Sequence, residues 1–461
     1  MAKEEFFDIA NVQRKFFLTC VTKDISFRVR QLEILRKTII ENEKEILDAL
    51  RSDLGKPEME AYVAEVSDVI NDIDIAVKNI RRWAKPLKTP TPLMLFPAKS
   101  YIYAEPYGSV LIIAPWNYPF KLAMSPLVGA MAAGNCVVVK PSEYAPHTAR
   151  VIVDIITRCF ESRYIKAIEG GVEEARMLLE QKFDYIFFTG GTAIGKIVAM
   201  AAATNLTPVT LELGGKSPCI VDEDIDIEKT AKRICWGKFF NAGQSCISPD
   251  YLIAHKSVKQ KLIQAMIKCI EKFYGKDPFT SPDYARIVNE KHFLRVSELL
   301  KEGNIVCGGE TNAEKLYIAP TIVDNIPPDA KITREEIFGP VLPVMEYDNL
   351  DEVIADINKG AKPLALYFFS RNKEKQDKIL KETSAGDVNI NDTMAHIQNK
   401  HLPFGGVGDS GIGKYQGKWS FDTFSHKKSV VKRAFFIDPA MKYPPYKIPL
   451  AMIKKLMKFM G

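Results

Sequence analysis

The sequence predicts an α/β fold with two sheet regions, and three observations support this prediction. From residue 108 to residue 221, short apolar runs alternate with segments of helical periodicity, a pattern typical of parallel strands joined by helices. A similar mixed pattern continues from residue 213 to residue 413. The chain has 461 residues, about three times the ~150 residues of a typical domain, so two or three hydrophobic cores are expected.

The N-terminal region, from about residue 12 to residue 85, is predicted to be helical. Its apolar residues stand three or four apart, and Gly and Pro are almost absent. A proline-rich connection follows, from residue 85 to residue 98. The next segment, Ser100–Glu105, is strand-like and is predicted to form an exposed arm.

The range 122–139 contains eighteen uncharged residues, which approaches the length of a membrane-spanning helix. Its interior argues against a span, because Pro126, Gly129 and the pair Gly134-Asn135 interrupt it. The sequence therefore predicts a helix of small residues, a turn and the buried strand Cys136–Lys140.

The remaining strands are predicted from short apolar runs bounded by turn residues. Those of the first region are Val110–Ala114, Cys136–Lys140, Tyr185–Thr189 and Val209–Glu212. Those of the second region include Ser217–Val221, Asp250–Ala254, Leu342–Glu346 and Ala365–Ser370. A last strand-like segment, Lys428–Lys432, and Ser100–Glu105 are candidates for pairing across subunits, or for pairing within the chain.

The end of the chain is predicted to form a basic amphipathic helix. Lys454, Lys455 and Lys458 fall on one helical face, and the opposite face carries Leu450, Ile453, Leu456, Met457 and Met460. Such a helix either packs on the body or on a partner subunit, or lies on an anionic membrane surface, and it is too short to span a membrane.

The composition excludes several classes of protein. Hydrophobic residues make up 46% and charged residues 26%, and the 27 Gly and 27 Pro are spread along the chain, which argues against a disordered or fibrous protein. The net charge is +6, but residues 441–461 carry five Lys and no acidic residue. The rest of the chain is therefore nearly neutral, and no nucleic-acid partner is expected.

The cysteines indicate a reduced, cytoplasmic chain without a metal site. All eight are scattered, with no C-x-x-C pair and no metal-ligand spacing relative to the six histidines. Residues 1–7 mix acidic residues into the position that a signal peptide fills with a basic and then an apolar run, so no export signal is expected.

Two glycine patterns resemble nucleotide-binding motifs. The run Gly406–Gly411 has the G-x-G-x-x-G spacing, but no strand precedes it, so a loop is predicted. The run Gly190–Lys196 has the frame of a P-loop, but Ile197 replaces the Ser or Thr that binds magnesium. It still joins a strand to a helix, so its free N–H groups favour a phosphate, although a plain tight turn has the same pattern.

Three residues are candidates for catalysis. Cys246 is flanked by small and polar residues, as an exposed nucleophile would be, whereas the other seven cysteines are taken as buried structural thiols. Glu212 interrupts an apolar strand, which suits a general base with a raised pKa or a salt bridge to a neighbouring Lys. Asn117 follows a strand, where its amide could stabilise an oxyanion or cap the next helix.

Seven motifs, in this order, resemble the aldehyde dehydrogenase superfamily over nearly the whole chain. They are Pro115-Trp-Asn-Tyr, Lys140-Pro-Ser-Glu, Phe188-Thr-Gly-Gly, Glu212-Leu-Gly-Gly-Lys, Gly243-Gln-Ser-Cys, Glu335-Glu-Ile-Phe-Gly-Pro and Pro403-Phe-Gly-Gly-Val-Gly. The residues after Cys246 and the segment Val388–Asp392 look most like the class-three branch, which includes fatty and aromatic aldehyde dehydrogenases.

The resemblance implies a division of the chain into functional parts. A Rossmann-like, parallel-sheet NAD(P)-binding domain would occupy residues 1–208, with an arm strand near 98–107. An α/β catalytic domain would occupy 209–413, and a small β oligomerisation arm would be completed by a return strand in 414–433. The basic amphipathic tail would be 434–461.

The resemblance also implies roles for the candidate residues. Cys246 would attack an aldehyde to give a thiohemiacetal, with its oxyanion held by Asn117 and the Cys246 backbone N–H. After hydride transfer, Glu212 would activate the water that hydrolyses the thioester. Tyr118, Trp236 and His396 would line the substrate pocket.

For the cofactor, the resemblance assigns Lys140 and Glu143 to the adenosine ribose and the turn Gly190–Gly195 to the pyrophosphate. It assigns Glu336 and Phe338 to the nicotinamide ribose and its surroundings. The sequence departs from the family at Gly191, where Ser is usual, so a hydroxyl contact would be lost. Glu143 would favour NAD over NADP by repelling a 2′-phosphate, although relatives in this branch often accept NADP.

The expected activity is the NAD(P)-dependent oxidation of medium- or long-chain aliphatic or aromatic aldehydes to carboxylic acids. The expected assembly is a homodimer, with peripheral membrane contact through the tail as a further possibility. Three alternatives stay open: a reductase that transfers the acyl group to coenzyme A, a cofactor-free cysteine hydrolase and a catalytically silent structural protein. The presence of Glu212 argues against the first, and the set Lys140, Glu143 and Glu336 against the second.

Overall fold

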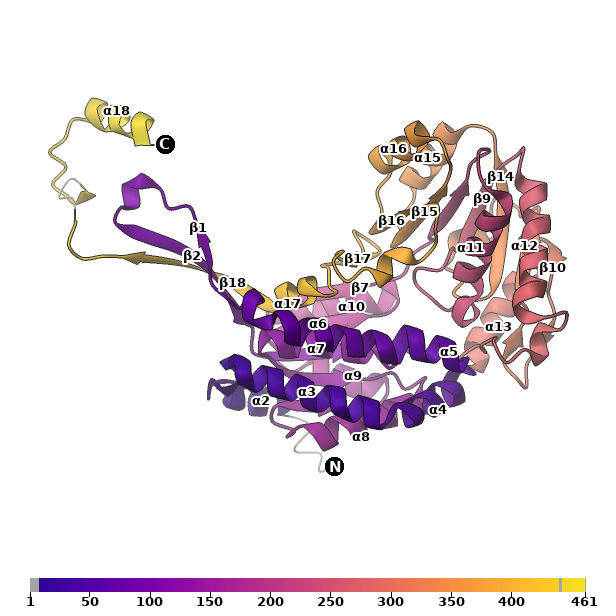
Figure 1. The fold of residues 1–461 in the computed structure, drawn as a ribbon, viewed down its shortest axis with the longest axis horizontal. Coiled ribbons are helices and arrows are strands. Elements are labelled where there is room, and N and C mark those ends of the chain that lie inside the picture. The colour runs from indigo at the N-terminus through magenta and orange to yellow at the C-terminus, as the bar shows by residue number, and fades with distance from the viewer. Residues whose placement is uncertain (1–7, 439–441, 461) are drawn as a thin grey trace.

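The computed structural model describes residues 8–438 and 442–460, so the prediction about an export signal in residues 1–7 lies outside the described residues. Figure 1 shows a two-part body, built on two sheets, from which a thin arm projects. The N-terminal region is helical, as predicted. Its helices are α2 (Ile9–Phe17), η1 (Val21–Lys23), α3 (Ile25–Glu41), α4 (Glu43–Leu54), α5 (Glu58–Ala61), the π turn η2 (Tyr62–Val66) and α6 (Ser67–Trp83).

The first sheet has six strands in the order β17-β7-β6-β3-β4-β5. All neighbours are parallel except β17, which is antiparallel to β7. The strands are β3 (Ser109–Ile113), β4 (Cys136–Lys140), β5 (Ile165–Ala167), β6 (Tyr185–Thr189), β7 (Val209–Glu212) and β17 (Gly411–Ile412). The connecting helices are α7 (Lys121–Ala133), α8 (Pro146–Cys159), α9 (Val172–Leu179) and α10 (Thr192–Thr204).

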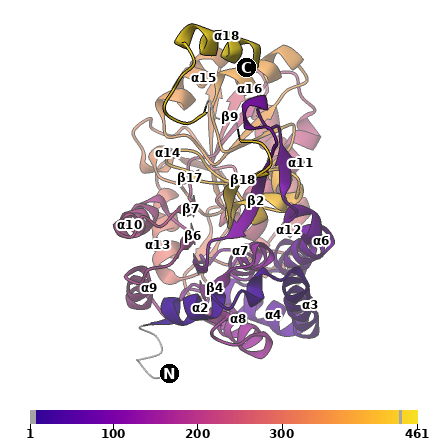
Figure 2. The ribbon, with the colours of Figure 1, turned by 90° about the vertical axis from the view of Figure 1, so that its left-hand side faces the viewer.

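Helices cover both faces of this sheet because successive side chains of each strand point to opposite faces. Val110 and Ile112 of β3 join the large core shared with α3, α6 and α7, whereas Leu111 and Ile113 join a second core shared with α2, α9 and α10. Figure 2 shows these two groups of helices on opposite sides of the strands. The strands β3, β4 and β6 are therefore buried along their whole length and mainly apolar, as expected for a parallel sheet covered on both faces.

The expected domain boundary between residues 208 and 209 lies one strand too early. Strand β7 pairs with β6, with Thr189 opposite Glu212, so residues 209–212 belong to the first sheet. Residues 411–412 return to the same sheet from the far end of the chain. The alternation of apolar runs shows where strands occur, but it does not show which sheet each strand joins.

The range 122–139 forms the helix, turn and strand that its sequence predicts. Helix α7 includes Pro126 and ends at Gly134, whose backbone is left-handed with φ of 99°, and β4 follows directly. No helix among the described residues is long and apolar enough to cross a membrane.

The second sheet has seven strands in the order β10-β13-β14-β9-β8-β15-β16, with only β10 antiparallel to its neighbour. Its strands are β8 (Pro218–Val221), β9 (Tyr251–His255), β10 (Asn304–Cys307), β13 (Thr321–Asp324), β14 (Val341–Tyr347), β15 (Ala365–Phe369) and β16 (Asp387–Ile390). A small hairpin pairs β11 (Thr311–Asn312) with β12 (Tyr317–Ile318).

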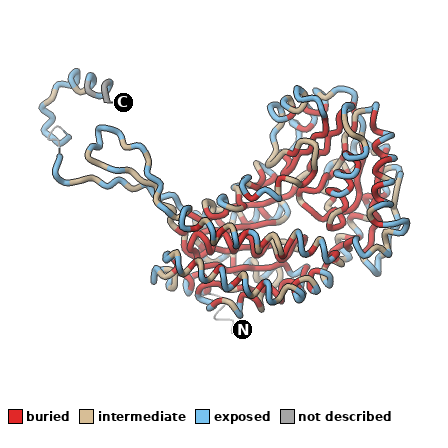
Figure 3. The backbone as a smooth tube through the Cα atoms, in the orientation of Figure 1, coloured by how far each residue is buried: buried red, intermediate tan, exposed pale blue. Residues whose placement is uncertain are grey.

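Helices and short 3₁₀ turns connect the strands of this second part. The helices are α11 (Ile227–Phe239), α12 (Lys259–Tyr274), α13 (Glu290–Leu299), α14 (Lys331–Arg334), α15 (Leu350–Lys359) and α16 (Lys373–Glu382). The turns are η4 (Phe240–Gly243), η5 (Pro278–Thr280) and η6 (Ala395–Gln398). Figure 3 shows that the buried backbone runs through both sheets, whereas the arm is exposed or half-buried.

The arm is a three-stranded sheet in the order β1-β2-β18. It consists of β1 (Leu87–Thr89), the turn η3 (Leu93–Leu95), β2 (Ala98–Pro106) and β18 (Ser425–Arg433), which follows α17 (Lys418–Thr423). The two strand-like segments considered for pairing across subunits pair with each other instead, with Ser429 opposite Ile102. The proline-rich connection contributes β1, which the sequence did not predict.

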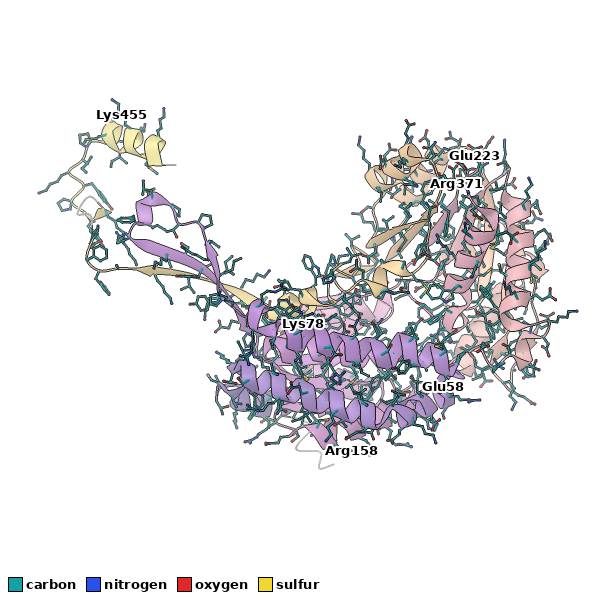
Figure 4. All side chains as sticks on the ribbon, viewed as in Figure 1. Glu58, Lys78, Arg158, Glu223, Arg371 and Lys455 are labelled. Carbon is teal, nitrogen blue, oxygen red and sulfur yellow. The ribbon has the colours of Figure 1, made fainter. Side chains whose placement is uncertain are left out.

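The predicted C-terminal helix is present as α18 (Leu450–Met460). It stands beside the end of the arm and apart from the two-part body, as the labelled Lys455 in Figure 4 shows. Leu450, Met452 and Met457 are 66%, 64% and 52% exposed, so packing of this helix on the chain's own body is not observed. The side chains of Leu456 and Met460, also assigned to the apolar face, lie outside the described residues.

Candidate active site

The segment before Cys246 has a strained backbone. Helix α11 ends at Phe239, and then Asn241 and Ala242 adopt left-handed conformations with φ of 52° and 51°. A Cβ atom on Gly243 would lie 2.3 Å from the carbonyl oxygen of Gly339, so only glycine fits there. Left-handed non-glycine residues persist only where the surroundings hold them, and they concentrate at functional sites.

The Cys246 thiol is reactive only after it loses its proton. Its pKa is raised to about 12, mainly by burial and also by the neighbouring carboxyl groups of Glu336 and Glu212, while its own backbone N–H acts in the opposite direction. The resting side chain is therefore a thiol, and thiolate formation needs help from the bound reactants or from a base. Among the other seven cysteines, Cys20 is exposed and Cys159 and Cys307 are half-buried, which corrects the expectation that all seven are buried.

Glu212 lies at the carboxyl end of β7, and its side chain is buried. Neither carboxylate oxygen has a hydrogen-bond partner within residues 8–438 and 442–460, and no ion pair with Lys414 forms there. The positive charge of Lys414 nevertheless acts to lower the pKa of Glu212. Burial raises the pKa of this carboxyl well above its usual value. An unpartnered carboxyl of this kind suits a general base that acts on a water molecule, and the salt-bridge alternative is not observed.

Asn117 lies between β3 and α7, and its side chain is buried. Its Nδ2 donates one hydrogen bond to the carbonyl oxygen of Gln244, over 3.1 Å, which leaves its second N–H hydrogen available. Helix α7 begins after Phe120 and has no side-chain cap, so Asn117 does not act as a helix cap. The Asn117 amide is therefore placed next to the segment that carries Cys246, where it can act as an oxyanion donor.

Two cavities meet at these residues. The first has a volume of about 320 Å³ and the second about 230 Å³. Both are lined by Leu122, Thr189, Glu212 and Cys246. The Cys246 thiol and the Glu212 carboxyl thus lie where a molecule in one cavity would touch a molecule in the other.

The second cavity is mostly apolar, and two of the three expected substrate-pocket residues line it. Tyr118 and Trp236 do so, together with Phe240, Phe404 and other apolar side chains. His396 does not, which corrects the expectation. It is buried behind the wall, where its Nδ1 is 2.6 Å from Asn389 Nδ2 and its ring stacks on Phe404. Sequence position alone does not show to which side of η6 a side chain points.

The first cavity contains part of the expected cofactor set. Gly190, Glu336 and Phe338 line it. Burial and Asp250 raise the pKa of Glu336 to about 8, and its Oε1 is buried without a hydrogen-bond partner in the described part of the chain. Gly214 makes room for this carboxylate, because a Cβ atom there would lie 2.1 Å from Oε2.

The other expected cofactor residues lie outside this cavity's lining. Lys140 and Glu143, at the carboxyl end of β4, form an ion pair with Nζ and Oε2 2.7 Å apart. Gly195 packs α10 against Leu213, since a Cβ atom there would lie 2.5 Å from Leu213 Cδ2. Gly191, by contrast, lines the first cavity and has open space around the position of a Cβ atom.

Sequence reasoning missed several residues that line the cavities. His292 and Arg295 come from α13 to the first cavity, and the His292 ring lies 4.9 Å from that of Trp116. Burial lowers the pKa of His292 to about 4, so it is neutral. Asp68 and Lys121 form an ion pair of 2.6 Å in the wall of the second cavity. None of these residues belongs to a motif, and only the tertiary structure brings them to the site.

No group of side chains able to hold a metal ion is found in the described ranges 8–438 and 442–460. The residues at the cavities offer a thiol, a carboxyl group and a side-chain amide.

Comparison with known proteins places this arrangement in a family. The model of the aldehyde dehydrogenase family matches residues 6–430. The chain is 50% identical to the 4,4'-diaponeurosporen-aldehyde dehydrogenase of Staphylococcus aureus, over 99% of both chains. It is 44% identical to a rat aldehyde dehydrogenase described as dimeric and NADP-preferring, over 95% of this chain and 97% of the relative.

The fold agrees with these sequence relationships. A substrate-bound structure of S. aureus AldH superimposes with a TM-score of 0.96 at 49% identity, over 99% of both chains. The predicted α/β fold and the resemblance to aldehyde dehydrogenases are thus confirmed. With a cysteine, a glutamate and an asparagine gathered at the junction of two cavities, and with relatives matched along nearly its whole length, the chain belongs to the aldehyde dehydrogenase family, whose members oxidise aldehydes.

Proposed function

We propose that this enzyme oxidises apolar aldehydes, either medium- or long-chain aliphatic or aromatic, to carboxylic acids through a covalent adduct on Cys246. The observation that carries the proposal is the junction of a largely apolar cavity with a second cavity at Cys246 and Glu212. An apolar pocket with few polar groups is what an aldehyde with a hydrocarbon body requires.

In the proposed reaction, the sulfur of Cys246, with its proton released to solvent, attacks the carbonyl carbon. The carbonyl electron pair moves to oxygen, and the free N–H of Asn117 and the Cys246 backbone N–H stabilise that charge. A dinucleotide held beside Glu336 and the start of α10 would supply the hydride acceptor that turns the thiohemiacetal into a thioester. Glu212 then takes a proton from water as the water oxygen adds to the thioester. It passes this proton to the departing Cys246 sulfur, so the acid is released and both the thiol and the carboxylate are restored.

The first cavity suits a dinucleotide. Glu336 presents a buried oxygen that has no hydrogen-bond partner among the described residues, and the open start of α10 at Gly191 offers backbone N–H groups to a phosphate. Lys140 and Glu143 lie at the carboxyl end of β4, which β3 separates from β6, and the adenosine ribose would reach them there. We propose NAD as the cofactor, because Glu143 would oppose a 2′-phosphate, with NADP as an alternative that the NADP-preferring relative supports.

A long substrate is favoured by the character of the second cavity and by the S. aureus relative, which is named for a diaponeurosporene aldehyde. Tyr118, Trp236, Phe240 and Phe404 would contact the hydrocarbon body. Each methylene group that enters such a pocket contributes roughly 0.8 kcal/mol, so chain length should strongly affect kcat/KM.

We further propose that the chain forms a homodimer through its arm. Its outer strand β18 leaves an open edge, and the segment after it exposes Phe435 and Phe436 by 103% and 77%. Open edges and exposed aromatic residues are costly on a monomer. The dimeric rat relative supports this assembly.

The test of the activity is cofactor reduction by purified enzyme across aldehydes from acetaldehyde to long-chain and aromatic ones. We expect Cys246-dependent reduction of NAD that rises with chain length, and no signal from Cys246→Ala. Thioester formation only in the presence of coenzyme A would indicate an acyl reductase, and ester hydrolysis without cofactor as the sole activity would indicate a hydrolase. Either result would overturn the proposal.

A further inference from the structure

A buried ion pair lies next to the two cavities and lines neither of them. Lys56 and Glu65 are both fully buried, and they contact each other. Lys56 follows Gly55, which ends α4 in a left-handed conformation, and Glu65 lies in the π turn η2. Figure 4 labels Glu58, at the start of α5, where these helices come next to the second part of the body. Single π turns inside helices often occur at functional sites.

The atoms of this pair bind the backbone on both sides of the Asn117 turn. Lys56 Nζ donates a hydrogen bond to the carbonyl oxygen of Asn117, over 3.0 Å. Glu65 Oε2 accepts hydrogen bonds from the backbone N–H groups of Phe120, at 2.9 Å, and Lys121, at 3.2 Å. Three hydrogen bonds from this pair therefore fix the backbone of the turn that runs from Asn117 to the start of α7 at Lys121.

The same helical segment also holds the loop that leads to Cys246. Glu60 Oε2 accepts a hydrogen bond of 2.9 Å from the backbone N–H of Asn241, the first of the two left-handed residues. Asn241 Nδ2 in turn donates to the Asn117 carbonyl oxygen, over 2.9 Å. The Asn117 carbonyl thus receives two buried donors, Lys56 and Asn241, that come from different parts of the chain.

Stability alone does not account for this arrangement. Removing two charges from water costs more than their mutual attraction usually returns, and apolar residues of similar size are often as stable or more stable in such positions. What an apolar pair does not provide is a donor for the Asn117 carbonyl and an acceptor for the start of α7. A misplacement of about 1 Å of a reacting group can reduce a rate by roughly 10²-fold.

We propose that Lys56 and Glu65 are positioning residues that hold the Asn117 side-chain amide at the oxyanion position. This inference rests on the proposed covalent reaction, in which Asn117 donates to the developing oxyanion. Neither residue is expected to touch the aldehyde, and their effect on the rate passes through Asn117.

The test is the double variant Lys56→Met/Glu65→Gln, which keeps side-chain volume and one acceptor for the N–H groups of Phe120 and Lys121. We expect an unfolding temperature close to that of the wild type, a decrease in kcat of about 10- to 100-fold and little change in KM. The alkylation rate of Cys246 by iodoacetamide should not change, because alkylation forms no oxyanion. The matched control is Arg36→Met/Asp74→Gln, which removes an exposed ion pair of 2.6 Å between α3 and α6 and should leave kcat unchanged.

The decisive measurement adds Asn117→Ala to the double variant. If the pair acts through Asn117, the triple variant should be no slower than Asn117→Ala alone, whereas independent effects would multiply. A folded double variant with wild-type kcat, or fully multiplied effects, would overturn the inference. Should the double variant not fold, Glu65→Asp keeps the charge but shortens the side chain, and the same comparison applies to it. A wild-type enzyme without aldehyde-dependent cofactor reduction would instead contradict the proposed function.

Discussion

Gly405 packs directly against the buried carboxyl of Glu212. A Cβ atom on Gly405 would lie 2.7 Å from Glu212 Oε1 and 2.6 Å from the carbonyl oxygen of Gly413. Its φ of 152° also falls in a region that other residues rarely adopt. The loop of residues 405–413, which returns to the first sheet through β17, therefore determines how much space the carboxyl has.

We expect Gly405→Ala to reduce kcat at least tenfold and to destabilise the protein by about 1–3 kcal/mol, because the added methyl group has no space. Steady-state kinetics and thermal unfolding measure both effects. The control is Gly408→Ala in the same loop, where the φ is 66° but nothing lies within 4 Å of the position of a Cβ atom. That variant should lose only about 1 kcal/mol of stability and keep its activity. Equal kcat values for the two variants would contradict the prediction.

Glu212→Gln should block hydrolysis but not the first half of the reaction. The amide cannot accept a proton from water, and loss of a general base typically reduces a rate by about 10²- to 10⁴-fold. Rapid mixing with aldehyde and NAD should give a burst of one NADH per active site, followed by slow turnover. Glu180→Gln, a change at an exposed carboxyl outside the candidate site, serves as control and should keep its turnover. Wild-type turnover by Glu212→Gln would exclude it as the base.

The reactivity of Cys246 should depend steeply on pH in the cofactor-free enzyme. Because the pKa of this thiol is raised to about 12, the reactive thiolate is the minor form, and its fraction grows about tenfold with each pH unit below that value. Iodoacetamide alkylation at Cys246 should therefore accelerate from pH 7 to pH 10 without a plateau. Cys246→Ala measures the background from thiols such as the exposed Cys20. A plateau near pH 8 would show that the pKa is not raised.

Gly191→Ser should be tolerated and slightly stabilising. Gly191 is the N-cap of α10 without a side-chain cap, and a Cβ atom there meets nothing within 4 Å. A Ser hydroxyl can accept a backbone N–H of the first turn, which is worth a few tenths of a kcal/mol relative to Gly. We also expect a few-fold lower Kd for NAD. Gly190→Ser is the contrasting variant and should be destabilised, because its Cβ atom would lie 2.5 Å from Phe188 Cζ.

Deletion of residues 441–461 should abolish binding to anionic vesicles. The side chains of Leu450, Met452 and Met457 are exposed, and α18 carries three Lys. Each Lys near an anionic surface contributes roughly 1 kcal/mol to the binding free energy. Binding should therefore also be lost in the triple variant Lys454→Glu/Lys455→Glu/Lys458→Glu. Vesicle flotation with and without anionic lipid measures this. Equal recovery of the full-length and shortened proteins would contradict membrane contact, and a shift to monomers on deletion would indicate that α18 binds the partner subunit.

The sequence by itself determined the local elements and the chemically reactive residues. Strand β4 could be predicted because a run of three Val between Cys136 and Lys140 suits a strand buried on both faces. Cys246, Glu212 and Asn117 could be identified because their residue types conflict with their neighbours or match ordered motifs. These properties depend on residues that are adjacent in the chain.

Only the tertiary structure decided the relationships between distant segments. It joined β7 to the first sheet, paired β2 with β18 inside one chain and left His396 out of the lining of the second cavity. It also brought Lys56 and Glu65 to the Asn117 turn. Neither residue shows a signal in the sequence, because a Lys or Glu on a helix is usually exposed to solvent, and burial depends on contacts with segments far along the chain.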